Sequence, residues 1–300
     1  MRISLVTPSF NQGDFIEETI VSVLSQGYED LEYIVMDGGS TDQTLSILKR
    51  YNRHLSAWIS EPDEGQAHAL NKGFSMATGE ICAYLNSDDL LLNGSLDAVV
   101  LFFQQHPEAK WVVSSTLVGS TPSNSSTWNP QVVSLEEFLV SQSFSQQGVF
   151  WRSDAIPRPW FDEQFDFIMD ADFFVHLYRV CGRPFVLPCL TSFFRIHPNS
   201  KTSNIAATMY SEAQVLRCKC SDLFSPSSLS NFYCDSSYLL FLSNQSKIRA
   251  LFLMRSRAYS MIFILLRSSV LSIWQSRRVF QSLPVLGKTF LLMFVSLGKT

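Results

Sequence analysis

The sequence lacks the short motifs that would place it in several common classes of protein. Its six cysteines include no CxxC pair, so a structural zinc site is not indicated. No GxGxxG follows the first predicted strand and no GxxxxGK(S/T) occurs, so neither a Rossmann dehydrogenase nor a P-loop nucleotidase is supported. No stretch of about 18 uncharged apolar residues is present, which disfavours a membrane-spanning helix.

Acidic residues are missing from the last part of the chain, because none follows Asp235. Residues 1–200 carry 11 Lys/Arg and 24 Asp/Glu, a net charge of −13, whereas residues 201–300 carry 12 Lys/Arg and 3 Asp/Glu, a net charge of +9. This asymmetry predicts two regions with different partners, 1–210 and 211–300. The second region is basic and apolar. Two alternatives stay open for it: a helical region lying on an anionic membrane surface, which we favour, or a helical appendage packed on the main domain.

A leader is not indicated either, because the apolar run in MRISLVTPSFNQG is too short for a signal peptide. The cysteines are scattered and do not form the framework of a disulfide-rich secreted domain. We therefore predict a reducing, cytoplasmic location, with peripheral contact at the inner face of the cytoplasmic membrane if the basic region binds lipid.

The chain does contain a regular alternation of predicted strands and helices from residue 1 to about 115. Apolar residues make up 46% of the composition, which is enough for a large core. Strands are predicted at 3–6, 31–36, 55–60, 81–85 and 111–115, and helices at 15–27, 44–51, 66–77 and 96–106. This order predicts a three-layer α/β/α fold with a mainly parallel central sheet. Further along, 120–130 is predicted to be a loop and 170–181 a helix.

Three polar loops, at 7–14, 37–42 and 86–89, each follow a predicted strand. The carboxyl ends of parallel strands form the ligand crevice of such sheets, so we expect the loops along one edge. The loop Asn86-Ser87-Asp88-Asp89 is unusual, because adjacent carboxylates repel each other where a buried strand ends. Taken alone, this loop fits either a solvated turn with an aspartate cap or a cation site.

Four segments carry a resemblance to a known family: TPSFNQGDFIEETIVSVLSQ, IVMDGGSTDQT, EPDEGQAHALNKGFSMATGE and AYLNSDDLL. In this order and spacing they resemble the family 2 glycosyltransferases of the GT-A fold, of the type that makes bacterial polysaccharides and cell-surface glycans. A looser similarity continues through SQQGVFWR, MDADFFVHLYRVCG and FFRIHPNSKTS. It covers about residues 1–203. The last third of the chain lies outside it and is expected to form a C-terminal helical extension.

The resemblance implies a nucleotide-sugar donor, such as a UDP-, GDP- or dTDP-sugar. The first strand end is expected to line the base through backbone atoms, Asp37 to accept from the base or ribose, and Arg195 to meet phosphate. The residues expected to contact the donor are Thr7, Pro8, Ser9, Asp37, Asp63, Gln66, Asn86, Asp89 and Arg195.

In the family an Asp-x-Asp motif holds a divalent cation that bridges the donor's diphosphate. The motif stands here as Asn86-Ser87-Asp88, with an amide in place of the first acid. The resemblance implies Mg²⁺ or Mn²⁺ as cofactor, with Asp88 as the acid on the metal and His197 as a metal or diphosphate ligand. A cation beside Asp88 would also favour the ionised forms of both adjacent acids.

The segment MDADFF resembles the acidic segment that supplies the catalytic base. Asp170 aligns best and Asp172 is the alternative; because residues two apart on a helix point in different directions, only one is expected to face the site. Asp170 also stands where a helix cap would stand. His68, where similar proteins often have an acid, either tunes the donor or lies on a helix surface. Trp151 is predicted to be a core residue rather than part of the acceptor site.

The resulting prediction is an inverting glycosyltransferase that moves a sugar from a nucleotide-sugar to a hydroxyl of a glycan or lipid-linked acceptor, with no nucleic-acid partner. The alternative is a nucleotide-sugar-binding module or regulatory subunit with lost catalysis, and Asn86 is the feature in its favour. A nucleotidyltransferase would need a basic loop after the first strand, and TPSFNQGD has no basic residue.

Overall fold

The computed structural model describes residues 1–201 and 206–223. The chain divides into two units, Met1–Asn204 and Ile205–Thr300. Of the second unit, the structure describes α8 (Ala206–Lys219) and the 3₁₀ turn η2 (Ser221–Leu223). Most of the basic, apolar region predicted at 211–300 therefore lies outside the described residues. Within the described part, no helix is both long enough and apolar enough to cross a membrane.

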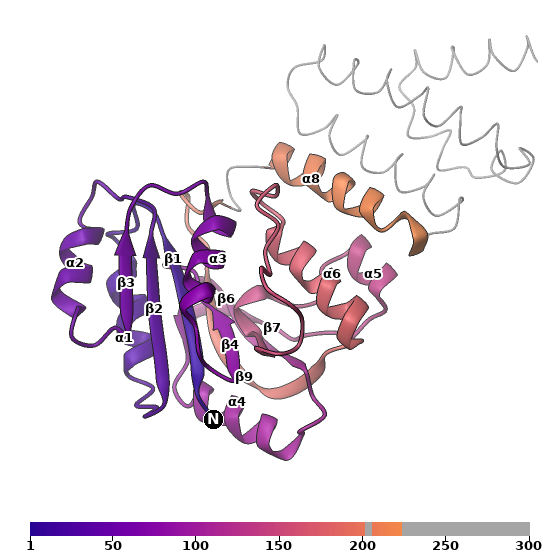
Figure 1. Cartoon of the computed structure of the whole chain (residues 1–300), viewed down its shortest axis with the longest axis horizontal. Coiled ribbons are helices and arrows are strands. Elements are labelled where there is room, and N and C mark those ends of the chain that lie inside the picture. The colour runs from indigo at the N-terminus through magenta and orange to yellow at the C-terminus, as the bar shows by residue number, and fades with distance from the viewer. Residues whose placement is uncertain (202–205, 224–300) are drawn as a thin grey trace, which may run out of the picture. The chain divides into compact units, whose positions relative to one another are not determined.

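Nine strands form one sheet in the described part of the first unit, in the order β3-β2-β1-β4-β8-β6-β9-β5, with β7 paired to β6 (Figure 1). Their bounds are β1 (Ile3–Ser9), β2 (Leu31–Asp37), β3 (Ala57–Ser60), β4 (Ile81–Tyr84), β5 (Leu90–Leu91), β6 (Trp111–Thr121), β7 (Asn124–Trp128), β8 (Val149–Arg152) and β9 (Phe185–Arg195). The first four are parallel to one another. Beyond them, β6 and β9 are parallel, but β4–β8, β6–β8, β6–β7 and β5–β9 pair antiparallel, so the sheet as a whole is mixed.

Helices cover both faces of the parallel part of the sheet, which confirms the predicted three-layer arrangement (Figure 1). The helices of the first unit are α1 (Ile16–Leu24), α2 (Thr44–Tyr51), α3 (Gln66–Met76), α4 (Ser95–Gln105), α5 (Leu135–Val140) and α6 (Met169–Cys181). Apolar residues of α1, α2 and α4 share one buried cluster with β1, β2 and β4. All seven residues of β1 are buried, as expected for a strand covered on both faces.

Helix α3 lies close against β1 and β2 on the other face, and Gly73 permits this approach. A Cβ atom at Gly73 would lie 2.6 Å from Val6 Cγ1 and 3.0 Å from Met36 Cγ. Further along the same helix, Phe74 packs against Trp151 and Trp160, with ring centroids 5.4 and 4.9 Å away. Trp151 is fully buried, which confirms its predicted core role.

The predicted loop at 120–130 was wrong. The segment belongs to a hairpin of β6 and β7, with Thr116 opposite Trp128 and Thr121 opposite Asn124. Its Ser and Thr side chains are mostly exposed, so the strand carries no apolar alternation and its composition resembles that of a loop. The predicted helix at 170–181 is α6, which starts one residue earlier.

The strand order predicts a ligand crevice at a defined place. Strand β1 lies between β2 and β4. The chain adds β2 and β3 on one side of β1 and then crosses to the other side to add β4, so the strand order reverses at β1. Ligands of open α/β sheets bind outside the carboxyl ends of strands at such a reversal. The loops after β1 and β2 are joined there, because Gly38 N donates to Ser9 O and Asn11 N donates to Ser40 Oγ. The loop after β4 begins at the neighbouring strand end.

Candidate active site

The loop Asn86–Asp89 connects β4 to the two-residue strand β5, and contacts from helix α1 hold its backbone in place. The Thr19 hydroxyl on α1 lies 2.9 Å from Ser87 O and 2.8 Å from Asp89 O. Asp89 N donates to Asn86 O, which closes the turn. Thr19 is buried, so these contacts fix the position of the loop Asn86–Asp89, here called the acidic loop, relative to α1. Nothing in the sequence pattern singled out Thr19.

Asp88 meets His197 at the surface of the crevice. His197 Nε2 lies 3.1 Å from Asp88 Oδ2, and the two side chains are 10% and 17% exposed. The contact follows from the sheet, because β5 pairs antiparallel with the end of β9, with Leu90 opposite Phe193. The strand pairing therefore brings two predicted metal ligands together from positions more than a hundred residues apart in the chain.

Asp89 points the other way and is fully buried. Its carboxylate accepts from Gln147 Nε2 at 2.7 Å, from Arg195 N at 2.9 Å and from Asn86 Nδ2 at 3.3 Å. Burial and the neighbouring Asp88 charge raise the pKa of Asp89 well above its usual range, while the three donors act against this rise. The two adjacent acids thus differ in role: Asp88 faces the crevice, and Asp89 ties three segments together.

Asn86 uses both ends of its amide. Its Oδ1 accepts from Gln66 Nε2 at 2.8 Å, and its Nδ2 donates to Asp89 Oδ2 and, at 3.4 Å, to Gln146 Oε1. A carboxylate could not make the second pair of contacts, because an ionised acid has no donor. The departure from the Asp-x-Asp pattern therefore has a local cause, the buried acceptors around Asn86. Gln146, which sequence reasoning missed, also donates to Tyr84 O.

Arg195 is held within the protein rather than extended into the crevice. Its Nε donates to Asp88 O at 2.8 Å and its Nη2 to Glu18 Oε2 at 2.5 Å. The guanidinium also lies over the Phe15 ring, 5.2 Å from its centroid, and the side chain is 11% exposed. These contacts suit a residue that braces the acidic loop.

The predicted base-binding residues lie at the ends of β1 and β2. Thr7 is buried with its hydroxyl 3.2 Å from Tyr33 Oη, so only its backbone remains for a ligand. Ser9 is buried, and its Oγ has no hydrogen-bond partner among the described residues. Asp37 is buried and accepts from Ser40 N at 2.9 Å and from Ser60 Oγ at 2.6 Å.

Three further residues, Pro8, Asp63 and Phe10, lie near this edge. Pro8 is part of β1, opposite Met36 of β2, and Asp63 Oδ1 accepts from Gly65 N just before α3. Phe10 follows Ser9 and is 60% exposed, which is unusual for so large an apolar side chain. Sequence reasoning missed Phe10, although an aromatic residue between Ser9 and Asn11 at a strand end was the available signal.

Asp170 lies in the first turn of α6, where Ile168 and not Asp170 occupies the capping position. Its side chain is half-buried, and Oδ1 accepts from Ala171 N at 2.8 Å. Burial raises the pKa of Asp170 to about 6, against the effect of the Ala171 amide and of Lys201 nearby. Asp172 is also half-buried, but two residues further along the helix it points in another direction.

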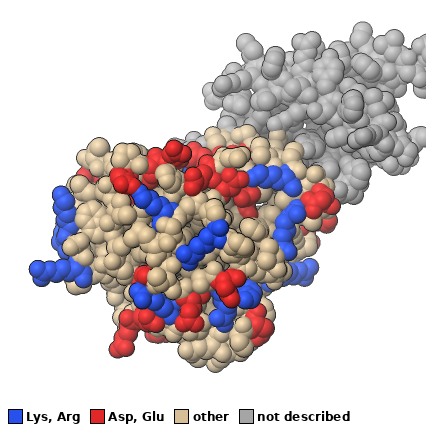
Figure 2. Space-filling view, in the orientation of Figure 1, with Lys and Arg blue, Asp and Glu red and all other residues tan. Residues whose placement is uncertain are grey.

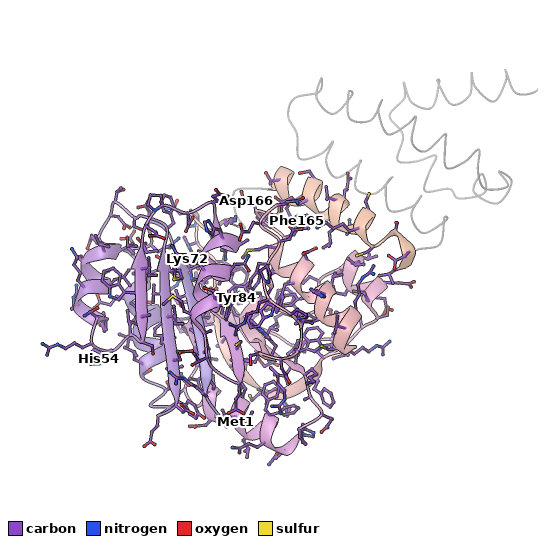
Figure 3. The ribbon with its side chains drawn as sticks, viewed as in Figure 1. Met1, His54, Lys72, Tyr84, Phe165 and Asp166 are labelled. Carbon is purple, nitrogen blue, oxygen red and sulfur yellow. The ribbon has the colours of Figure 1, made fainter. Side chains whose placement is uncertain are left out.

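Tyr84 connects the two acidic parts of the crevice. It is the last residue of β4 and is buried (Figure 3). Burial raises its pKa well above the usual range, and the carboxylates of Asp170 and Asp89 add to the rise. Both acids therefore lie within electrostatic reach of one phenol at the end of β4.

A second group of ligand-type side chains lies beside α3. One ligand atom from each of Glu64, His68 and Glu163 lies within 4.8 Å of the others. However, His68 Nδ1 accepts a hydrogen bond from Glu64 N at 3.1 Å, which places the ring proton on Nε2. Metal-bound histidines have the reverse arrangement, with the second nitrogen donating. This geometry favours a hydrogen-bonded cluster at the N-terminus of α3.

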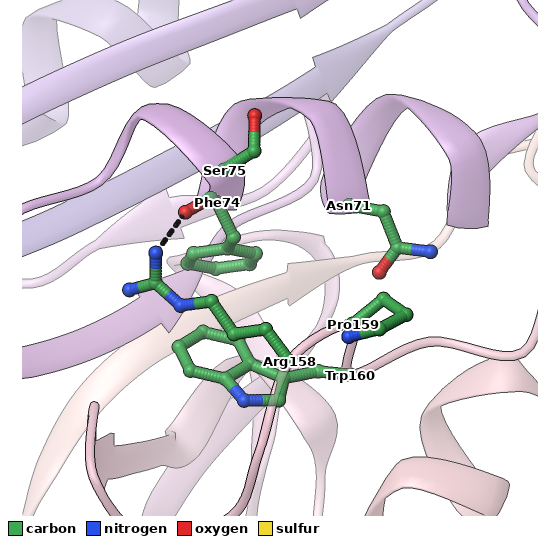
Figure 4. A pocket seen from close by; sticks show the side chains of 6 residues that line it. All are labelled: Asn71, Phe74, Ser75, Arg158, Pro159 and Trp160. Carbon is green, nitrogen blue, oxygen red and sulfur yellow. Dashed lines mark hydrogen bonds between the residues drawn. The ribbon is translucent and has the colours of Figure 1, made fainter.

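A cavity of about 320 Å³ lies between α3 and the segment 158–160, away from the strand ends (Figure 4). Its polar lining is already used: Arg158 Nη1 donates to Phe74 O at 2.6 Å, and Asn71 Nδ2 donates to Phe161 O at 2.8 Å. None of the predicted site residues lines it. The chemistry of the chain therefore points to the crevice and not to this cavity.

Acidic side chains gather along the upper edge of the domain, where the parallel strands end (Figures 1 and 2). Such an edge repels phosphate, because like charges raise the free energy of approach. A cation between a nucleotide diphosphate and the carboxylates would remove this repulsion. The described side chains that can hold a cation at this edge include the pair Asp88 and His197.

Comparison with known proteins gives the class to which this fold and crevice correspond. Residues 4–155 match the family model described as glycosyl transferase family 2, and the chain belongs to this family. Among curated proteins, it is 36% identical over 106 residues to TuaG of Bacillus subtilis, a putative teichuronic acid biosynthesis glycosyltransferase; the match covers 34% of this chain and 42% of TuaG. The chain spans only 33% to 42% of the first curated relatives it matches.

Solved structures show the same fold. S. aureus TarS in complex with UDP aligns with a TM-score of 0.55 and 20% identity, covering 72% of this chain and 64% of that chain. The mannosyltransferase PcManGT from Pyrobaculum calidifontis, in complex with GDP-Man and Mn²⁺, aligns with a TM-score of 0.54 and 17% identity, covering 92% and 88%. The predicted GT-A fold and the predicted family are therefore confirmed.

Proposed function

We propose that this protein is an inverting, cation-dependent glycosyltransferase. It moves a sugar from a nucleotide-diphosphate-sugar to a hydroxyl of a glycan or lipid-linked acceptor. The observation that carries the proposal is the contact of Asp88, in the loop after β4, with His197, together with the electrostatic interaction of Asp170 with Tyr84, the last residue of β4. One group can hold a cation against a diphosphate, and the other can accept a proton.

The side chains of Asp88 and His197 fit a divalent cation. Two ligands at right angles around Mg²⁺, each with a bond of about 2.1 Å, lie about 3 Å apart. The observed separation of Oδ2 and Nε2 is 3.1 Å. A carboxylate with an imidazole and phosphate oxygens is a suitable ligand set for Mn²⁺ as well as Mg²⁺. When bound, the cation would supply positive charge to the leaving diphosphate.

Asp170 is suited to act as the base. Its pKa of about 6 leaves the carboxylate mostly ionised at neutral pH, yet more basic than an exposed aspartate. In a single displacement, the acceptor oxygen forms a bond to the anomeric carbon while the bond from that carbon to the diphosphate oxygen breaks. The electron pair of the broken bond leaves with the nucleoside diphosphate, and the acceptor proton passes to Asp170.

The donor is proposed to be a UDP- or GDP-sugar, with a dTDP-sugar as the third candidate. UDP and GDP-Man are the ligands named for the similar structures above. Ser9 Oγ, Asp37 and the exposed ring of Phe10 supply a hydroxyl, a carboxylate and a stacking face at one place, which suits a nucleoside.

Loss of catalysis is the second candidate, and the Asn86 contacts argue against it. The amide is used to hold Gln66, Gln146 and Asp89, so its presence needs no loss of function to explain it. A cytoplasmic enzyme acting at the membrane surface is the proposed setting, supported by the absence of acidic residues after Asp235. Sedimentation with anionic and with neutral vesicles tests this setting, and equal binding to both would contradict it.

Calorimetric titration tests the transferase itself. UDP-, GDP- and dTDP-sugars are titrated into wild-type protein and Asp88→Ala, each with and without Mn²⁺, and donor hydrolysis is followed in parallel. One donor should bind tightly only with both the metal and Asp88 present, and it should be slowly hydrolysed. Binding without any hydrolysis or transfer would favour the non-catalytic module, and folded protein that binds no donor would refute the proposal.

A further inference from the structure

The ring of Phe15 lies against two functional side chains that come from the far end of the domain. Its centroid is 4.3 Å from that of His197, with the ring planes inclined by 39°. The Arg195 guanidinium lies over the same ring at 5.2 Å. Phe15 is the residue immediately before α1, so an element early in the sequence supports the segment that follows β9.

His197 lies beyond the end of β9, which stops at Arg195. Its backbone belongs to a turn in which Ser200 N donates to His197 O. An imidazole can serve as a ligand only if its plane and both side-chain torsions direct the correct nitrogen to the metal. The packed face of Phe15 restricts the plane of the ring, and Nε2 is then directed to Asp88.

Phe15 is itself held by the loop that leads into α1. Phe15 N donates to Gln12 O at 2.9 Å, Gln12 N donates to Thr44 Oγ1 at 3.1 Å, and Gly13 N donates to Asp42 Oδ2 at 2.8 Å. These bonds join the loop to the start of α2. The ring is thus a fixed platform, and it touches the cation site without offering a ligand atom of its own.

We propose that Phe15 is a positioning residue for the cation site, which holds His197 in the orientation that allows Nε2 and Asp88 to bind one divalent ion together. The inference rests on the proposed function, because it requires the pair to be the cation site. It predicts that the aromatic face of residue 15 sets the affinity for the cation, while the affinity for nucleotide without metal does not depend on it.

The test measures Mn²⁺ binding by the loss of the free-ion electron paramagnetic resonance signal, on the full chain with UDP present. Phe15→Leu keeps an apolar side chain and removes the ring face, and should weaken Mn²⁺ binding about tenfold, the lower end of the effect of removing a metal ligand's support. Phe15→Tyr retains the ring and should bind Mn²⁺ close to the wild-type value. Binding of UDP in EDTA, followed by calorimetry, should be the same in all three proteins.

The chain offers a matched control in Phe102 and His106. Their rings form a similar pair, with centroids 4.4 Å apart and planes inclined by 32°, at the end of α4 away from the crevice. Phe102→Leu should leave Mn²⁺ binding unchanged. Equal weakening by Phe102→Leu and Phe15→Leu, unchanged binding in Phe15→Leu, or no rescue by Phe15→Tyr would each overturn the proposal.

Asp88→Ala separates failure of this inference from failure of the proposed function. If Asp88→Ala loses Mn²⁺ binding and Phe15→Leu does not, the cation site stands and Phe15 has no part in it. If Asp88→Ala binds Mn²⁺ as the wild type does, the cation site itself is wrong, and the role of Phe15 falls with it.

Discussion

Replacement of Asp170 by asparagine should abolish most of the activity and at the same time stabilise the fold. The pKa of this carboxyl is raised from 3.8 to about 6, mainly by burial, so the folded protein favours its neutral form. At neutral pH the carboxylate is ionised nonetheless, and the folded state bears the free-energy cost of the buried charge. An amide has a similar shape and can still accept from Ala171 N, but it carries no charge.

The magnitude follows from linkage between protonation and folding. A shift from 3.8 to about 6 corresponds to about 3 kcal/mol, at about 1.4 kcal/mol for each pKa unit. Because the side chain keeps some contact with water, we expect about 1 to 3 kcal/mol. The folded state binds the proton more tightly, so the wild type loses this stability as pH rises from 3.8 to 6 and regains none above it. The free energy of unfolding of Asp170→Asn should not show this decrease between pH 3.8 and about 6, because the amide does not ionise.

Urea unfolding of both proteins, followed by tryptophan fluorescence at pH 4.5 and 7.5, measures the difference directly. Asp170→Asn should be more stable at pH 7.5 and similar at pH 4.5, while kcat falls about 100- to 10,000-fold, as expected on loss of a general base. The wild-type kcat/KM should fall with decreasing pH through about 6. A variant that retains activity, or that is less stable than the wild type at pH 7.5, would refute the assignment of Asp170 as a buried base.

Three other substitutions test the support of the crevice. Asn86→Asp places a second charge beside buried Asp89 and removes the two hydrogen bonds that Asn86 Nδ2 donates. It should therefore lower the free energy of unfolding by about 1 to 3 kcal/mol at pH 7.5. A smaller loss at pH 4.5 than at pH 7.5 would confirm that charge repulsion contributes to the destabilisation. Thr19→Val removes the hydroxyl that contacts the backbone carbonyls of Ser87 and Asp89. It should lower the free energy of unfolding, measured in urea, by about 1 to 2 kcal/mol and should weaken Mn²⁺ binding. Unchanged Mn²⁺ binding would show that the loop keeps its shape without this hydroxyl. Gly73→Ala puts a methyl group 2.6 Å from Val6 Cγ1 and should destabilise the fold by about 1 to 3 kcal/mol, and a neutral result would mean that α3 can move outward.

Much of the parallel half of the fold could be predicted from the sequence, because its signals are local. Mainly apolar runs mark β1, β2 and β4, and a change to helical spacing marks α2 and α3. Each polar loop follows its strand directly, so the sequence alone predicts which polar residues lie at the ends of β1, β2 and β4. The buried start of β6 was predicted as the strand 111–115, whereas the rest of the hairpin with β7 was missed because its side chains are mostly exposed and show no apolar alternation.

Side-chain direction at the site was less predictable. The adjacent acids Asp88 and Asp89 have the same chemistry, yet one faces the crevice and the other is buried beneath it. Arg195 has a side chain suited to phosphate, but Asp88 O and Glu18 hold two of its nitrogens. The direction of each of these side chains depends on residues from distant segments that pack against it, and the local spacing of residues does not predict those contacts.

The alternation of elements, the polar strand ends, the charge asymmetry and the family could all be predicted from local sequence, since they depend on residues near one another in the chain. The pairing of β5 with β9 that sets His197 against Asp88, and the packing of Phe15 on that imidazole, are visible only in the folded protein. The same holds for the electrostatic effect of both Asp170 and Asp89 on Tyr84. The physical reason is that long-range strand pairing and burial arise from many weak contacts made at once. Their sum fixes the positions of a few polar groups whose own sequence signals are no stronger than those of an ordinary turn.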